Sequence, residues 1–193
     1  MKQNNTCDWP GNNPLMIEYH DKEWGEPVHD DQKHFEFMTL DAFQAGLSWA
    51  IIMNKREGFR KAFDHFDVNK IARYDETKIQ ELLKDPGIIR NQMKIRATVH
   101  NARKFIEIQQ ESGSFDDYIW QFTGHNTIHN QWTSLNQIPA TSPESDAMSK
   151  DLKKRGFKFV GSTICYAYMQ AAGMVNDHLV KCFRNKELKI LSI

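Results

Sequence analysis

The sequence has no excess of charge of either sign, because Lys and Arg together number 25 and Asp and Glu together also number 25. Many nucleic-acid-binding domains are basic throughout, so any surface for a polyanion must here be a local patch. No apolar run approaches the roughly 20 residues of a membrane-spanning helix. The polar start MKQNNTCDWPGNNP also lacks the apolar stretch of a secretory signal. We therefore expect a cytoplasmic protein with no membrane partner.

Cysteine is scarce, with Cys7, Cys165 and Cys182 as the only three. In a reducing compartment such residues are free thiols or metal ligands more often than disulfides. Internal repeats, low-complexity tracts and Gly/Ser linkers are also missing. A chain of 193 residues has the size of one domain. We therefore expect a single unit over residues 1–193.

The sequence offers no segment of alternating polar and apolar residues long enough to predict a strand. Helical spacing is present instead, and the positions Phe115, Tyr118, Ile119 and Phe122 follow it after a candidate cap at Ser114. This periodicity recurs through most of the chain. It predicts an all-α fold class.

Other segments support the same fold class. Phe59, Phe63 and Phe66 form one predicted helical stripe, and Ile79, Leu82 and Leu83 form another behind a candidate cap at Asp75. A long helix is predicted from about Asn91 to Gln110, and a helix start at Ser142-Pro143. Residues 123–145 are predicted to be mainly loop.

The two ends of the chain carry residues of metal-ligand type. Cys7 and His20 lie near the start, and His178 and Cys182 lie near the finish. If helical, the last two would project from one face, one turn apart. Two Cys and two His make a complete ligand set for a closed structural zinc site, which would join residues 7–20 to residues 178–182. Coincidence is the alternative, because eight His and three Cys allow many pairings.

A turn between two predicted helices is a candidate for phosphate binding. The segment LLKDPGIIRNQMKI places Asp85, Pro86 and Gly87 between them, which predicts a helical hairpin near residues 76–100. Backbone N–H groups at such a turn can hold a phosphate, and Arg90 and Lys94 would add positive charge. A helical hairpin with no DNA contact uses the same turn residues.

The segment LDAFQAGLSW is a candidate for binding a flat base. It holds Asp41, Gln44 and Trp49, and together with Tyr19 and Trp9 it could frame a pocket for a cationic aromatic ring. The alternative is an ordinary core helix on which Trp49 packs and Asp41 is solvated. Spacing by itself does not decide between the two.

Several ordered strings together resemble the type I DNA-3-methyladenine glycosylases over almost the whole chain, from about Cys7 to Cys182. The matching strings are Cys7-x-Trp9, Glu18-Tyr19-His20-Asp21, Glu23-Trp24-Gly25, Gln44-Ala45-Gly46-Leu47-Ser48-Trp49, Gly87-Ile88-Ile89-Arg90, Leu152-Lys153, Arg155-Gly156-Phe157-Lys158-Phe159-Val160-Gly161, Ile164-Cys165-Tyr166 and Asn176-Asp177-His178. So many strings in order are far more specific than one motif.

The resemblance implies a helix-hairpin-helix glycosylase fold. It also implies an activity, the excision of alkylated adenine from double-stranded DNA, and we expect the enzyme to be a monomer. It implies one structural zinc ion on the four Cys and His residues named above. It assigns the base pocket to Tyr19, Trp49 and Asp41, and the residues that enter the gap in the duplex to Gly46 and Leu47. The reaction it implies is hydrolysis after base flipping.

Two positions depart from the family pattern. Asp41 stands where the family commonly has Glu, and Met16 where it often has Tyr. The aspartate side chain is shorter by about 1.5 Å, so activity should survive better than fine selectivity. Two other functions are compatible with the sequence. One is a damage-binding module without catalysis, and the other is a structural zinc domain that binds proteins. Release of a free base from methylated DNA separates the first of these from a glycosylase.

Overall fold

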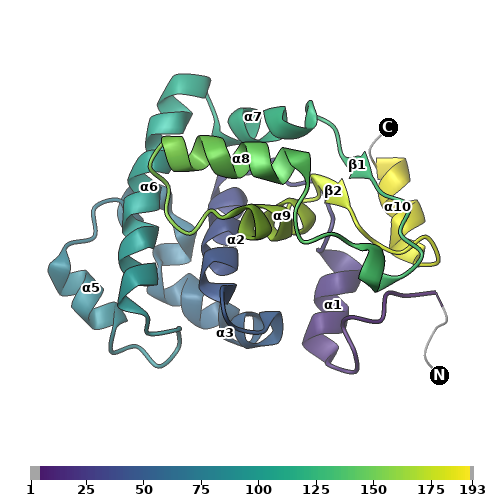
Figure 1. Cartoon of the computed structure of the whole chain (residues 1–193). Coiled ribbons are helices and arrows are strands. Elements are labelled where there is room, and N and C mark those ends of the chain that lie inside the picture. Colours follow the sequence, from purple (N-terminus) through teal and green to yellow (C-terminus); the bar gives the residue numbers. More distant parts are fainter. Residues whose placement is uncertain (1–4, 192–193) are drawn as a thin grey trace.

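The computed structural model describes residues 5–191 and consists mainly of α-helices, which confirms the predicted class (Figure 1). The helices in chain order are α1 (Pro14–Lys22), α2 (Asp31–Gln44), α3 (Trp49–Ala62), α4 (Val68–Ile71), α5 (Glu76–Leu82), α6 (Gln92–Ser112), α7 (Phe115–Trp120), α8 (Pro143–Lys154), α9 (Ser162–Ala171) and α10 (Phe183–Leu191). Short 3₁₀ helices are η1 (Asp64–Phe66), η2 (Gln121–Thr123) and η3 (Leu135–Gln137). None of the described helices is long and apolar enough to cross a membrane.

One small sheet was not predicted. Strands β1 (Ile128–His129) and β2 (Val175–Asn176) pair in parallel, with Ile128 opposite Val175. Two-residue strands are too short to show alternation, so periodicity could not reveal them. The pair attaches the loop before α8 to the segment that follows α9.

The predicted helix starts agree with the structure. The side chains of Asp75, Ser114 and Ser142 each accept a hydrogen bond from a backbone N–H in the first turn of α5, α7 and α8. Asn91 caps α6 in the same way, at the boundary expected for the long helix. These local hydrogen bonds satisfy donors that a helix leaves free at its start.

Two predicted helical stripes extend beyond the helices that contain them. Helix α3 ends at Ala62 and α7 at Trp120, so Phe66 and Phe122 belong to the 3₁₀ helices that follow. Residues 64–66 have positive φ angles, which turn the chain away from the axis of α3. Phe66 is nevertheless buried and Phe122 half-buried, so the spacing identified inward-facing residues while overestimating helix length.

Helix α2 lies at the centre of the molecule. It contacts α3, α6, α7 and α9, and the long α6 and the α8–α9 pair lie beside it in Figure 1. Fully buried phenylalanines surround it, and the rings of Phe105 and Phe115 stack with centroids 3.9 Å apart. Burial of such rings is the main source of stability in a fold of this size. A residue on the inner face of α2 is therefore held on all sides.

An ionic network fixes α1 against this centre. Arg56 of α3 donates through both terminal nitrogens to the Glu23 carboxylate, at 2.6 Å each, and through Nε to Glu36 of α2 at 2.8 Å. Burial alone would raise the pKa of Glu23, but the Arg56 guanidinium, together with the Lys33 ammonium group, lowers it to about 2. Since Arg56 is itself buried, the bidentate pairing orients the C-terminal end of α1, which carries Tyr19 and His20.

Gly58 allows the hairpin after α5 to approach α3. A Cβ atom at Gly58 would lie 2.2 Å from the Gly87 carbonyl oxygen, far inside van der Waals contact. We expect Gly58→Ala to lower the free energy of unfolding by about 1–3 kcal/mol, because the hairpin must move away. Chemical denaturation measures this difference.

The matched control is Gly161→Ala. Gly161 has φ −65°, and nothing lies within 4 Å of a Cβ built there. The same added methyl group should leave stability within about 0.5 kcal/mol of the parent protein. Equal stability of the two variants would show that the hairpin does not require the close approach.

Candidate functional site

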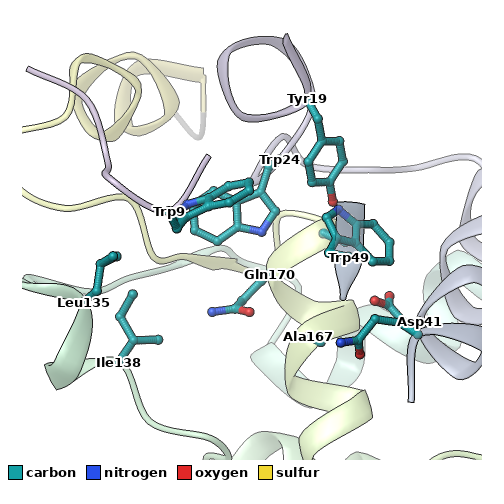
Figure 2. A pocket seen from close by; sticks show the side chains of 11 residues that line it. Trp9, Tyr19, Trp24, Asp41, Trp49, Leu135, Ile138, Ala167 and Gln170 are labelled. Carbon is teal, nitrogen blue, oxygen red and sulfur yellow. The ribbon is translucent and has the colours of Figure 1, made fainter. Parts of the chain in front are cut away.

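A cavity of about 410 Å³ lies between α1, the α2–α3 turn, η3 and α9. It has the size typical of a small-molecule site. The five residues predicted to frame a base pocket all line it: Trp9, Tyr19, Asp41, Gln44 and Trp49. Figure 2 shows Trp9 and Trp24 on one side of this space, and Trp49 and Asp41 on the other. Residues from both ends of the chain therefore share one cavity.

Asp41 is the most unusual group in the cavity. The residue is 3% exposed, and its Oδ2 atom is buried with no hydrogen-bond partner within residues 5–191. Burial raises the pKa of this carboxyl well above its usual value. The alternative of a solvated Asp41 is therefore wrong. An unpaired buried carboxyl is costly to maintain unless a ligand supplies its partner.

Four aromatic side chains line the same cavity as this carboxyl. The rings of Tyr19 and Trp49 lie 5.6 Å apart, and those of Trp9 and Trp24 lie 5.1 Å apart. Burial raises the pKa of Tyr19 well above its usual value, and the nearby Asp41 adds to this effect. The phenol thus remains a hydrogen-bond donor. Flat aromatic faces beside a carboxyl form a site suited to a planar cation.

The α2–α3 turn closes one edge of the cavity. Gly46 has φ +83° and is exposed, a conformation that glycine adopts without strain. Gln44 donates its side-chain amide to the Leu47 carbonyl at 2.8 Å, which holds the turn in shape. Gly46 and Leu47 are thereby presented at the surface next to the cavity.

Lys94 does not occupy the position expected of a phosphate contact. The residue is 7% exposed, and its ammonium group donates to the carbonyls of Phe43 and Ala45 at 2.8 and 2.7 Å. Those carbonyls are left without intrahelical partners where α2 ends, and the lysine satisfies them. Lys94 therefore joins α6 to the α2–α3 turn, and its buried ammonium group is not free to bind a phosphate.

The predicted helical hairpin is present, with α5 and α6 packed together on either side of a turn. Asp85 accepts from the backbone N–H of Gly87 at 2.6 Å, and Lys55 of α3 donates to the Pro86 carbonyl at 2.7 Å. Arg90 follows this turn and is exposed. The hairpin is thus braced against α3 while its cationic residue faces outward.

A second site lies behind the indole pair of the cavity. Cys7, His20, His178 and Cys182 are all buried, and one ligand atom from each lies within 4.8 Å of the others. The Sγ atom of Cys182 is 3.5 Å from His20 Nε2 and 3.5 Å from His178 Nδ1. These four residues can hold one metal ion.

The expectation that His178 and Cys182 share a helical face is wrong. Helix α10 begins only at Phe183, and both residues lie in the loop that follows β2. This loop turns back so that the Leu179 N–H donates to the Cys7 sulfur at 3.4 Å. The ligand set is therefore assembled by tertiary packing of a loop.

The remaining ring nitrogens of the two imidazoles also have partners. His20 Nδ1 lies 2.6 Å from the Asp21 carboxylate, and His178 Nε2 lies 2.9 Å from the Trp24 carbonyl. Each ring therefore has one nitrogen fixed as a donor and the other directed at the cluster, as metal-binding histidines require. Hydrogen bonding from Cys7 and contacts with both imidazoles lower the pKa of the Cys182 thiol despite its burial, which favours a thiolate.

Comparison with known proteins decides the family. The family described as methyladenine glycosylase matches residues 9–185. DNA-3-methyladenine glycosylase 1 of Escherichia coli (strain K12) is 48% identical over 176 residues, which cover 91% of this chain and 94% of the relative. The DNA-3-methyladenine glycosylase of Haemophilus influenzae is 44% identical and covers 91% and 95%. The chain belongs to the methyladenine glycosylase family.

Solved structures of other family members have the same fold. A crystal structure of 3-methyladenine DNA glycosylase I is 48% identical with a TM-score of 0.90, and covers 92% of this chain and 98% of that chain. The enzyme from Staphylococcus aureus, described for its recognition of 3-methyladenine, is 31% identical with a TM-score of 0.91 and covers 94% and 97%. The arrangement of helices is therefore that of a methyladenine glycosylase throughout.

Several cavity residues of this methyladenine glycosylase were not identified from its sequence. They all line the cavity, and they are Trp24, Leu135, Ile138, Ala167, Gln170 and Ala171. Trp24 lies in one of the family-like strings and could have been found there. Leu135 and Ile138 fall in the segment predicted to be loop, where no periodic signal indicates which residues face inward.

Proposed function

We propose that this protein hydrolyses the N-glycosidic bond of 3-methyladenine in DNA, as a base-excision repair enzyme. The observation that carries the proposal is the unpaired, buried Asp41 carboxyl in an aromatic cavity. An alkylated adenine in DNA is planar and positively charged, so it supplies both the flat face and the counter-charge that this cavity lacks. Family membership supports the same substrate class.

The proposed reaction begins with the damaged nucleotide outside the DNA stack, because a base within the duplex cannot reach a cavity of this kind. Trp49 stacks on the cationic ring, a contact of about 1–2 kcal/mol when desolvated. Asp41 and Tyr19 bind the edge of the ring. Leu47 fills the space that the base leaves, and Gly46 lets the turn approach the strand.

Bond cleavage then requires little from the protein. The bond between the sugar carbon and the ring nitrogen breaks, and its electron pair neutralises the charge on the departing base. Water adds to the oxocarbenium-like sugar carbon and releases a proton to solvent. Since no lysine is among the described residues that line the cavity, we propose hydrolysis without a covalent Schiff base and without strand cleavage.

We propose that the hairpin near residues 76–100 binds the DNA backbone in the manner of a helix-hairpin-helix motif. The turn around Gly87 and the exposed Arg90 face outward while Lys55 and Gly58 hold the turn from within. Double-stranded DNA containing alkylated adenine is the proposed partner, bound by a monomer that forms one unit over residues 1–193. Such a protein would act on chromosomal DNA in the cytoplasm.

We propose that the metal in the second site is zinc. A tetrahedral zinc ion separates a sulfur and a nitrogen ligand by about 3.5 Å and two nitrogens by about 3.3 Å. The corresponding distances are 3.5 Å for Cys182 to each histidine and 3.2 Å between His178 Nδ1 and His20 Nε2, and Cys7 Sγ lies somewhat farther out, at 3.8 Å from His178 Nδ1. Four protein ligands leave no open position, so bound zinc would hold the chain ends together and take no part in the reaction.

Asp41 provides the direct test of the proposed activity. Asp41→Asn keeps shape and removes charge, so single-turnover release of 3-methyladenine from methylated DNA should slow about 10- to 100-fold, the value of one charge-assisted hydrogen bond. Asp41→Glu keeps the carboxylate and should retain or raise the rate. Because burial raises the pKa of Asp41, the parent rate should also rise with pH as this carboxyl loses its proton, and the rise should be absent in Asp41→Asn.

The control is Asp30→Asn at the opposite end of the same helix. Asp30 is an exposed N-cap that accepts from Lys33 N, and asparagine caps equally well, so the rate should not change. Parent-like rates in Asp41→Asn would place the active site elsewhere. A protein that binds methylated DNA and releases no base at all would instead be a damage-binding module.

Arg90 and Lys94 should separate DNA binding from stability. Arg90→Ala should weaken binding to damaged and undamaged duplexes alike. The slope of the logarithm of the binding constant against the logarithm of salt concentration should become shallower by the amount that one phosphate contact contributes, and the free energy of unfolding should not change. Lys94→Ala should lower the free energy of unfolding by about 2–3 kcal/mol, because two carbonyls at the end of α2 lose a charged donor. Salt-dependent binding and denaturant unfolding measure both. A destabilised Arg90→Ala or a fully stable Lys94→Ala would contradict this division.

Zinc content tests the second site. Elemental analysis should find about one zinc per chain, and a strong chelator should lower the melting temperature, because metal binding contributes to the folding free energy. Cys182→Ala should lose the metal. Cys165→Ala is the control, since this cysteine is buried outside the cluster and its loss should leave zinc content unchanged. Metal-free protein with the same melting temperature would rule out a structural zinc ion.

A further inference from the structure

Asp177 connects the wall of the cavity to a buried hydrogen-bond network. Its Oδ1 atom accepts from Asn130 Nδ2 and Trp132 Nε1 at 2.7 Å each. Its Oδ2 atom accepts from the Tyr166 hydroxyl at 2.7 Å and from Gln170 Nε2 at 2.8 Å. Asp177 is 1% exposed, so the carboxylate depends on these four donors in place of solvent. A carboxylate has about four acceptor positions, and all of them are occupied here.

This network determines how the Gln170 amide is oriented. A carboxylate oxygen only accepts, so the NH₂ group of Gln170 must face Asp177 and the carbonyl oxygen must face away from it. Figure 2 shows that oxygen on the side of Asp41, and the nitrogen on the side of Leu135 and Ile138. No hydrogen bond to the Gln170 oxygen is found within residues 5–191, so its acceptor capacity is available to a ligand.

The surrounding surface of α9 leaves room for such a ligand. Ala167 and Ala171 flank Gln170 on the face of α9 that lines the cavity, and both side chains are a single methyl group. Gln170 is therefore the one polar group that the described part of α9 directs into this space. Its position is set by Asp177 before any ligand binds, which limits the entropy lost on binding.

Resting on the proposed function, we infer that Gln170 is a specificity-determining residue that accepts a hydrogen bond from the exocyclic amino group of the flipped base. In a 3-methyladenine nucleotide this amino group is the only N–H donor of the ring system. 3-Methylguanine carries a carbonyl oxygen at the ring position where 3-methyladenine carries this amino group. A fixed acceptor therefore favours the adenine lesion and opposes the guanine lesion, because two acceptors cannot pair.

Gln170→Met tests the inference, because methionine has a similar length and neither donor nor acceptor of comparable strength. The substrate is double-stranded DNA methylated with dimethyl sulfate, which contains both 3-methyladenine and 3-methylguanine. Single-turnover release of each base is measured by chromatography with enzyme in excess. We expect the rate ratio of 3-methyladenine to 3-methylguanine to fall about tenfold, the effect of one hydrogen bond gained or lost. Gln170→Asn, which withdraws the oxygen by about 1.5 Å, serves if methionine prevents folding.

Tyr166→Phe is the matched control. It also removes one hydrogen bond to Asp177 Oδ2, but Tyr166 does not line the cavity. The variant should lose stability in thermal unfolding and keep the parent ratio of released bases. A purely structural role of Gln170 would make the two variants alike.

The outcomes separate this inference from the proposed function. A parent protein that releases no methylated base contradicts the glycosylase activity itself. A parent protein that releases 3-methyladenine, together with a Gln170→Met ratio within twofold of the parent ratio, overturns the role of Gln170 alone. If neither the parent protein nor Gln170→Met releases 3-methylguanine, the release rate of 3-methyladenine is compared instead. A tenfold fall relative to Tyr166→Phe supports the inference, and a rate within twofold of that control overturns it.

Discussion

The meeting of the two chain ends at Cys7, His20, His178 and Cys182 is the constraint on which the cavity depends. The imidazole of His178 lies 4.6 Å from the ring of Trp24, and that of His20 lies 5.5 Å from Trp9. Both indoles also line the cavity, so the cluster and the cavity share one wall. Whatever holds the four ligands together thereby holds that wall in position.

The second constraint is the cost of burying Asp41. Its helix packs against four others, and within residues 5–191 no donor reaches the buried Oδ2 atom, although the carboxyl borders the cavity. The raised pKa of this carboxyl favours its neutral form in the free protein, and a bound cation would favour the charged form. In the proposed function this arrangement exchanges some stability of the free protein for selective binding of a charged base, as is common at active sites.

The sequence alone determined those features that depend on neighbouring residues. The caps at Asp75, Ser114 and Ser142 are found where they were predicted, because each capping bond spans only three residues. The all-α class follows from spacing for the same reason. The family follows from the ordered strings. The four candidate metal ligands and the five cavity residues follow from matching those strings to the family, which requires no geometry.

Tertiary structure alone decided which distant groups several of these residues meet. The sequence suggested that Lys94 is an exposed cation, but it binds carbonyls about 50 residues away at the C-terminal end of α2. The orientation of the Gln170 amide depends on Asp177. Gly58 is required because the Gly87 carbonyl lies where a Cβ atom would be. A one-dimensional pattern records which face of a helix is polar. The partner on that face is chosen by packing between distant segments, and a hydrogen bond formed across such a contact leaves no periodic trace in the sequence.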